Sequence, residues 1–241
     1  MYKFKFSIVM AVYNVEQFLA EAIESVLKQD IGFEENVQLI LVNDGSKDSS
    51  GKICDFYQAK YPNNIVVVHK ENGGVSSARN EGLKYVEGKY INFLDSDDKL
   101  SPATMKNVYN FFEEHYDEVD VVSIPIVFFE GQKGNHVLNY KFNKGSRVID
   151  LNEEYNCIQL SLSSSFVKAE CAREIFFDTR LKYAEDAKEC IKILLKKQKL
   201  GVVKEACYDY RKRLSGEASA LQNASLNKAW YMPYLNYFSN S

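Results

Sequence analysis

Residues 90–98 run Tyr90-Ile91-Asn92-Phe93-Leu94-Asp95-Ser96-Asp97-Asp98 and pass from an apolar run into three carboxylates. The apolar part is rich in aromatic and β-branched residues and predicts a strand buried inside a sheet. Carboxylates this close repel one another, and hard oxygen ligands suit Mg²⁺ or Mn²⁺. Ligands of open α/β sheets bind at the carboxyl ends of strands, so this cluster is a candidate metal site. The alternative is a solvated acidic turn in which Asp98 or Ser101 caps the next helix.

The composition excludes several classes of protein. The 241 residues are 46% hydrophobic, which is enough for one substantial core, and the formal net charge is −3. This charge gives no support for nucleic-acid binding, for which a basic surplus is expected. The five cysteines form no C-x-x-C pair and the three histidines no H-x-x-x-H pair, which argues against a disulfide framework and a zinc site. The N-terminus lacks a signal-peptide core, and no apolar run is long enough to span a bilayer. We therefore expect a soluble cytoplasmic protein.

The first hundred or so residues alternate between two kinds of hydrophobic pattern. Continuous apolar runs predict buried strands, and apolar residues at 3.6-residue spacing predict helices between them. Turn and cap signals such as Gly45 and Ser101-Pro102 separate the elements. The alternation predicts a parallel sheet with right-handed crossovers. We expect strands at 7–12, 37–42, 65–68 and 90–94, and helices that carry Phe18 to Leu27, Ile53 to Tyr57, Val75 to Val86 and Met105 to Phe112.

The second half is less regular. Residues 119–129 are strongly β-forming, a turn is expected at 131–134, and 137–142 is expected to be the returning strand of a hairpin. Residues 161–166 form a polar segment of small side chains. An amphipathic helix is expected over 186–195 and a further strand from Val202, followed by a basic loop at 211–213.

Polar side chains collect where the predicted strands end. No G-x-G-x-x-G follows a strand and no G-K-[ST] occurs, so the dinucleotide and P-loop fingerprints are missing. A carboxylate such as Asp44 can accept from a nucleobase N–H, and Arg79 can hold a diphosphate or a base. A metal at the acidic cluster can bridge the same diphosphate. Each residue also has a simpler explanation, because Asp44-Gly45 is a common turn pair and Arg79 can be a surface ion pair. Their shared location favours a nucleotide diphosphate.

Four stretches together resemble the successive signatures of family 2 glycosyltransferases, which have the GT-A fold. They are residues 7–14, 42–46, 72–80 and 93–98, and the resemblance continues through Glu185-Asp186 and Tyr210-Arg211 to about Ser219. The resemblance implies an α/β fold with a Rossmann-like, mostly parallel sheet flanked by helices and a smaller acceptor-side region. The expected domain spans 1–219, with a nucleotide-binding half at about 1–100 and an acceptor half at about 101–219.

The resemblance also implies a role for individual residues. Asp186 is the expected general base, with Glu185 as the next candidate. Asp97 of the D-x-D holds Mn²⁺ or Mg²⁺. The nucleotide is contacted by Ala11, Tyr13, Asn14, Asp44, Asn72, Arg79, Asp95 and Ser96, and a flexible loop with Arg211, Arg213 and Ser215 closes over the diphosphate.

The implied activity is an inverting, metal-dependent transfer of a sugar from a nucleotide donor, usually a UDP-sugar, to a hydroxyl of a glycan or lipid-linked acceptor. A bacterial surface polysaccharide is the expected context. The alternative is a GT-A module that binds a nucleotide or a partner without turnover. A sugar-1-phosphate nucleotidyltransferase ranks below both, because its glycine-rich N-terminal signature is missing. Contact with the inner face of the membrane and a homo-oligomer are left open.

Two features depart from the family pattern. Ala11 stands where proline is common, and Ser163-Ser164-Ser165 stands where many members carry an aromatic-Asn-Lys segment that faces donor sugar and acceptor. Residues 220–241 form an aromatic, amphipathic C-terminal segment that includes Trp230 and Phe238. We expect this segment to be a docking helix, a membrane-surface contact or the start of a truncated region.

Overall fold

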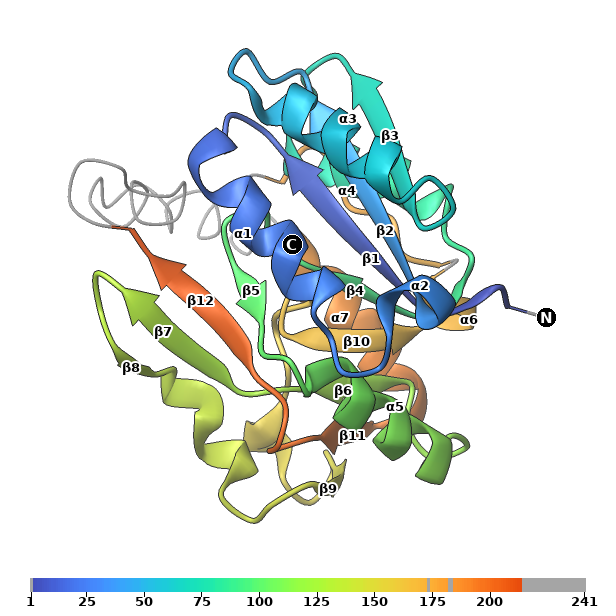
Figure 1. The fold of residues 1–241 in the computed structure, drawn as a ribbon. Helices are drawn as coiled ribbons and strands as arrows, with labels where there is room; N and C mark the ends of the chain where they lie inside the picture. The colour runs from blue at the N-terminus through green and yellow to red at the C-terminus, as the bar shows by residue number, and fades with distance from the viewer. Residues whose placement is uncertain (1, 173, 182–183, 214–241) are drawn as a thin grey trace.

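The computed structural model describes residues 2–172, 174–181 and 184–213. Its larger sheet has the strand order β3-β2-β1-β4-β10-β6-β11-β9 (Figure 1). The first four of these are parallel, as predicted, and β10 is antiparallel to both β4 and β6. The strands are β1 (Phe4–Val12), β2 (Val37–Asp44), β3 (Ile65–Lys70), β4 (Gly88–Phe93), β6 (Val121–Ser123), β9 (Arg147–Asp150), β10 (Ser165–Lys168) and β11 (Lys199–Val202).

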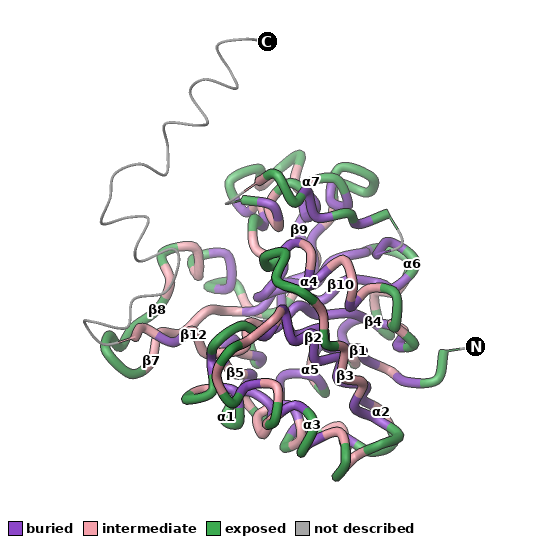
Figure 2. Tube along the Cα trace, turned by 90° about the horizontal axis from the view of Figure 1, so that it is seen from above, coloured by how far each residue is buried: buried purple, intermediate pink, exposed green. Residues whose placement is uncertain are grey.

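Helices cover both faces of this sheet because successive side chains of a strand point to opposite faces. Ile8 and Met10 of β1 join one apolar core, and Val9 joins the other. The helices of the first core are α1 (Glu16–Leu27), α3 (Ser50–Lys60) and α5 (Thr104–Glu114), with the short α2 (Phe33–Asn36) at its edge. The helices of the second core are α4 (Gly74–Leu83), α6 (Ala169–Ala172) and α7 (Glu185–Lys197). Figure 2 shows the central strands buried between these layers.

A second, smaller sheet has the order β5-β12-β7-β8 and lies beside the first (Figure 1). It consists of β5 (Lys99–Leu100), β12 (Tyr208–Lys212), β7 (Ile126–Glu130) and β8 (Gly134–Asn135). β5 follows the acidic cluster directly, and β12 pairs with it through Tyr208 and Asp209. The small sheet therefore brings the end of the described chain back to the carboxyl end of β4.

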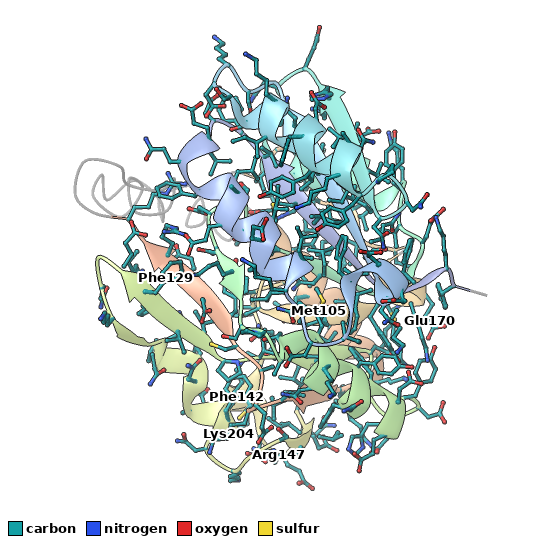
Figure 3. The ribbon with its side chains drawn as sticks, in the orientation of Figure 1. Met105, Phe129, Phe142, Arg147, Glu170 and Lys204 are labelled. Carbon is teal, nitrogen blue, oxygen red and sulfur yellow. The ribbon has the colours of Figure 1, made fainter. Side chains whose placement is uncertain are left out.

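The second half differs from the prediction in several places. The strand expected to begin at Val202 is β11, which ends there, and residues 211 and 212 belong to β12 rather than to a loop. Residues 119–129 are not one strand, because the chain leaves β6 of the large sheet and enters β7 of the small one around Pro125, which has no N–H for a ladder. Residues 137–142 are not a returning strand but the 3₁₀ helix η1 (Val137–Phe142), whose Phe142 is labelled in Figure 3. The Asn139 side chain accepts from the N–H of Ile126 at 3.1 Å and donates to its carbonyl at 2.8 Å. It thus takes the place of a strand neighbour.

The helix predicted over 186–195 is confirmed as α7, which begins at Glu185. The short 3₁₀ helix η2 (Tyr155–Cys157) was not predicted. In the ranges that the structure describes, no helix is both long and apolar enough to cross a membrane. Residues 220–241 lie outside the described residues, and the boundary at 219 stays a prediction.

Candidate active site

The acidic turn after β4 directs its three carboxylates to different partners. Asp98 is buried and accepts from the Tyr208 hydroxyl at 2.7 Å and from the Arg211 backbone N–H at 2.7 Å. Burial and the neighbouring Asp97 and Asp95 raise the pKa of Asp98 well above its usual range. Asp98 therefore neither faces solvent nor caps a helix; it ties strand β12 to the turn.

Asp97 faces the last described residue of the chain. Arg213 donates to Asp97 Oδ2 from Nε at 3.0 Å and from Nη2 at 2.7 Å. Burial and repulsion from Asp95 raise the pKa of Asp97, and Arg213 opposes this shift. A cationic side chain thus stands beside the carboxylate for which the sequence predicted a cation.

Asp95 and Glu185 are joined by Arg79, which projects from α4. Arg79 is 5% exposed and donates from Nη2 to Asp95 Oδ1 and from Nη1 to Glu185 Oε1, both at 2.9 Å. Burial lowers the pKa of Arg79, but Asp95 and Glu185 outweigh it and raise the pKa overall. Asp95 Oδ2 also accepts from the Ser163 hydroxyl at 3.1 Å, and the Tyr208 hydroxyl oxygen, whose proton goes to Asp98, lies 3.3 Å from it. Arg79 is therefore not a surface ion pair; it connects the acidic turn to the start of α7.

Asp186 lies in the first turn of α7, next to Glu185. Its Oδ1 accepts from the Ala187 N–H at 2.8 Å and its Oδ2 from the Leu162 N–H at 3.4 Å. Burial raises the pKa of Asp186, Asp95 adds to this, and Arg79 opposes it. Burial likewise raises the pKa of Glu185 against Arg79. The N-cap position of the helix belongs to Ala184, so Asp186 is not its cap.

Asp44 ends β2 and is 2% exposed. Its carboxylate accepts from Lys70 Nζ at 2.6 Å and from the backbone N–H groups of Gly73 at 2.9 Å and Gly74 at 2.7 Å. The Asn72 side chain donates to the Asp44 carbonyl at 2.9 Å. Asp44 therefore fixes the loop before α4, the helix that carries Arg79. A carboxylate can accept about four bonds, so it has room for one more donor.

The remaining predicted nucleotide contacts lie around the carboxyl ends of β1 and β4. Tyr13 is 49% exposed, and Ala11 and Ser96 are half-buried. Asn14 has a φ of 48° and ties its turn to the β2–α3 loop, because it donates its N–H to Ser46 Oγ at 3.1 Å and accepts from the Lys47 N–H at 2.8 Å.

Arg211 does not lie in a loop, contrary to the prediction. It is in β12, is 5% exposed, and donates from Nε to the Asp97 carbonyl at 2.7 Å. Its terminal nitrogens pair with Glu130 and Glu21. Its guanidinium lies over the rings of Phe18 and Phe129, the latter labelled on β7 in Figure 3. Through these contacts Arg211 connects α1, β7 and the acidic turn. Ser215 lies outside the described residues.

Sequence reasoning missed Lys70 and Tyr208. It placed Ser163 in a stretch that faces donor sugar and acceptor but did not predict its contact with Asp95. Lys70 ends β3 beside Asp44 at the end of β2, and these two residues are partners in the strand register. Adjacent parallel strands end at one edge, so this pair could have been found. Tyr208 precedes the recognised Tyr210 by two residues and therefore shares its face of the strand. Nothing in the local pattern points Ser163 at Asp95.

The residues of this site fit a divalent cation whose ligands come partly from the protein and partly from the substrate. Across the described residues, no three His, Cys, Asp or Glu side chains are arranged to hold a metal on their own. Mg²⁺ commonly binds through one or two carboxylates plus substrate phosphates. Both bonds from Arg213 go to Oδ2 of Asp97, which leaves Oδ1 for a cation. A cation there would offset the burial and the repulsion from Asp95 that raise the pKa of Asp97.

The comparisons with known proteins show the family of the chain. The model of glycosyl transferase family 2 matches residues 7–172. The chain belongs to this family. It is 52% identical over 240 residues to the minor teichoic acid biosynthesis protein GgaB of Bacillus subtilis, and the match covers 100% of this chain and 26% of GgaB. It is 41% identical to GgaA of the same organism, over 96% of this chain and 52% of that protein.

The fold has a close counterpart among solved structures. TarS 1–349 of S. aureus in complex with UDP-GlcNAc superposes with a TM-score of 0.76 at 27% identity, over 90% of this chain and 62% of that one. The family and the GT-A fold predicted from the sequence are therefore confirmed. The chain spans about a quarter of GgaB and about half of GgaA.

Proposed function

We propose that this chain is the catalytic domain of a metal-dependent, inverting glycosyltransferase. Its donor is a UDP-sugar, and its acceptor is a hydroxyl of a glycan or lipid-linked polymer. The family membership and a TarS structure with bound UDP-GlcNAc support the nucleotide-sugar donor. The names of GgaB and GgaA support a teichoic-acid polymer as the acceptor. Such an acceptor places the enzyme at the inner face of the membrane.

The observation that carries the proposal is the position of Arg79 between Asp95 and Glu185. It joins the acidic turn, which would face the donor, to the start of α7, which would face the acceptor. A pure nucleotide-binding module needs the first group but has no use for the carboxylate pair of buried Glu185 and half-buried Asp186. This argues for turnover rather than binding alone.

The donor half of the site would hold the nucleotide through several elements. The Asp44 carboxylate accepts three bonds, from Lys70, Gly73 and Gly74, and would accept a fourth from uracil N3–H. The rest of the nucleoside would lie among Ala11, Tyr13, Asn14, Asn72 and Ser96. Asp97 would hold Mn²⁺ or Mg²⁺, which when bound supplies Lewis-acid stabilisation of the leaving diphosphate. Arg213 would exchange its bond to Asp97 for one to the diphosphate.

Asp186 would act as the general base. The acceptor oxygen attacks the anomeric carbon, the bond from that carbon to the diphosphate oxygen breaks, and the hydroxyl proton passes to a carboxylate. The two N–H bonds to Asp186 orient it, and its raised pKa makes it a stronger base than an ordinary Asp.

The test is a transfer assay with a panel of UDP-sugars that includes UDP-GlcNAc, with Mn²⁺ and a purified teichoic-acid polymer, in which released UDP and labelled polymer are both measured. We expect both products in equal amounts. Donor binding by calorimetry without polymer labelling or donor hydrolysis would reject the catalytic proposal in favour of a binding module.

A further inference from the structure

Residues 161–165 bridge the two acidic parts of the site. The Leu162 N–H reaches Asp186 at 3.4 Å, and the Ser163 hydroxyl reaches Asp95 at 3.1 Å. This segment includes Ser163-Ser164-Ser165, which stands where many members of the family carry an aromatic-Asn-Lys segment. Its position therefore sets contacts to both the proposed base and the donor-side carboxylate.

Gln159 holds this segment from beneath. It is 3% exposed, and the two hydrogens of its Nε2 are shared among three acceptors, which are the Ser161 carbonyl at 2.9 Å, Ser164 Oγ at 2.9 Å and Ser165 Oγ at 3.0 Å. One amide group thus fixes three of the five residues of the segment. From the sheet side, Asn92 donates to the carbonyls of Ser163 and Ser165, both at 2.8 Å.

Lys141 holds Gln159 in turn. It lies in η1, is 4% exposed, and donates to Gln159 Oε1. Among the ion pairs of the described residues none includes Lys141, and burial lowers its pKa to about 8. An ammonium buried without a carboxylate is costly. An apolar side chain at this buried position would avoid that cost. The Lys141–Gln159 pair is therefore expected to have a role other than core packing.

We propose that Gln159, oriented by Lys141, is a positioning residue that holds residues 161–165 so that Leu162 reaches Asp186 and Ser163 reaches Asp95. The inference rests on the proposed function, in which Asp186 is the base. Gln159 acts only through the segment and contacts no substrate. The competing account is that the Lys141–Gln159 pair contributes to folding alone.

The test replaces both partners together, in the double variant Lys141→Met and Gln159→Met. The double replacement removes the buried ammonium together with its acceptor, which limits the loss of stability. Ser165 Oγ still donates to the Ser161 carbonyl at 2.6 Å, whereas buried Ser164 Oγ loses its bond from Gln159. We expect a folded protein in which the backbone amides of residues 161–165 exchange hydrogen faster. Turnover should fall by about 10- to 100-fold, because a misplacement of about 1 Å can cost 10²-fold.

The pH profile separates positioning from folding. The Leu162 N–H favours the ionised form of Asp186, so its loss should raise the pKa of Asp186 and move the acidic limb of the rate profile to higher pH. The matched control is Asn64→Leu. Asn64 is another buried amide whose two hydrogens are shared among three carbonyls, those of Phe33, Glu34 and Val37, but it lies at the amino ends of the strands. It should lower stability and leave the acidic limb unmoved.

If the double variant does not fold, Gln159→Asn gives a second test, because its shorter amide keeps the chemistry but cannot reach both Lys141 and the segment. Faster exchange with wild-type turnover and pH profile would overturn the proposal, as would unchanged exchange in either folded variant. A wild-type protein without transferase activity would instead reject the proposed function, and the exchange measurement would still show whether Gln159 holds the segment.

Discussion

The Asp186 carboxylate accepts from two backbone N–H groups, and an asparagine amide of the same size could occupy its place. Asparagine can accept one of these bonds, so Asp186→Asn should keep the fold while it removes the proposed base. We expect a variant that binds UDP and Mn²⁺ normally and transfers sugar at least about 100-fold more slowly, the lower end of the effect of a general base. Steady-state kinetics and UDP calorimetry measure the two parts. Asp150→Asn, at the end of β9, is the matched control. Near-normal turnover in Asp186→Asn would transfer the role to Glu185.

The ionisation of Asp186 should be visible in the rate of the wild-type enzyme. Burial raises its pKa above the ordinary value of 3.8, and a base works only when it is deprotonated. The rate should therefore fall as the pH drops through this raised pKa, with an acidic limb at higher pH than an ordinary aspartate gives. A profile of kcat/KM against pH measures this limb. A limb at or below the ordinary value would mean that Asp186 does not control the rate.

At the scale of the element, the packing of α4 on the sheet positions both Arg79 and the loop that Asp44 holds. Gly82 makes this close packing possible, because a Cβ there would lie 2.5 Å from Val9 Cγ1 and 3.3 Å from Val42 Cγ2. Both neighbours are short β-branched side chains in strands and cannot swing away. Overpacking of a core typically costs about 1–3 kcal/mol. We expect Gly82→Ala to lose stability by that amount in urea denaturation and to weaken UDP binding. Glu81→Ala on the same helix should change stability by less than about 0.5 kcal/mol, and an unchanged denaturation midpoint in Gly82→Ala would contradict the packing argument.

Local sequence pattern predicted the elements whose partners are their neighbours in the chain. The strands β1 to β4 and the helices between them follow from apolar periodicity, and the strand-end residues Asp44 and Asp95 follow from the topology. The failures occur where a distant residue decides. The Asn139 side chain makes the hydrogen bonds of the Ile126 backbone that a strand neighbour would otherwise make. Arg211 forms an ion pair with Glu21, which is 190 positions away in the sequence. The same holds for Ser163, whose contact with Asp95 depends on the antiparallel pairing of β10 with β4.

At the scale of the whole molecule, the second half of the chain completes a site that the first half begins. The parallel strands gather Asp44, Asp95 and Asp97 at one edge. The return of β12 adds Tyr208 and Arg213, and α7 adds Glu185 and Asp186. Charges of both signs thus alternate through the site, from Arg213 to Asp97 and from Asp95 through Arg79 to Glu185. Binding of a charged ligand to any one member must therefore affect the others.

This coupling predicts how UDP and Mn²⁺ stabilise the protein. A ligand that binds only the folded state raises its stability by mass action, so the melting temperature reports binding. Mn²⁺ alone would bind Asp97 beside the positively charged Arg213, which repels it, and should raise the melting temperature little. With UDP present, the diphosphate supplies further oxygen ligands to Mn²⁺ and an alternative partner to Arg213. The shift with both ligands should then exceed the sum of the separate shifts, because the coupling between two ligands is reciprocal. Asp97→Asn should remove most of the excess and keep the shift that UDP gives alone, while Asp150→Asn should behave as wild type. Equal shifts for UDP in Mn²⁺ and in EDTA would show that donor binding does not need the metal, and Arg213 would then be the permanent partner of Asp97.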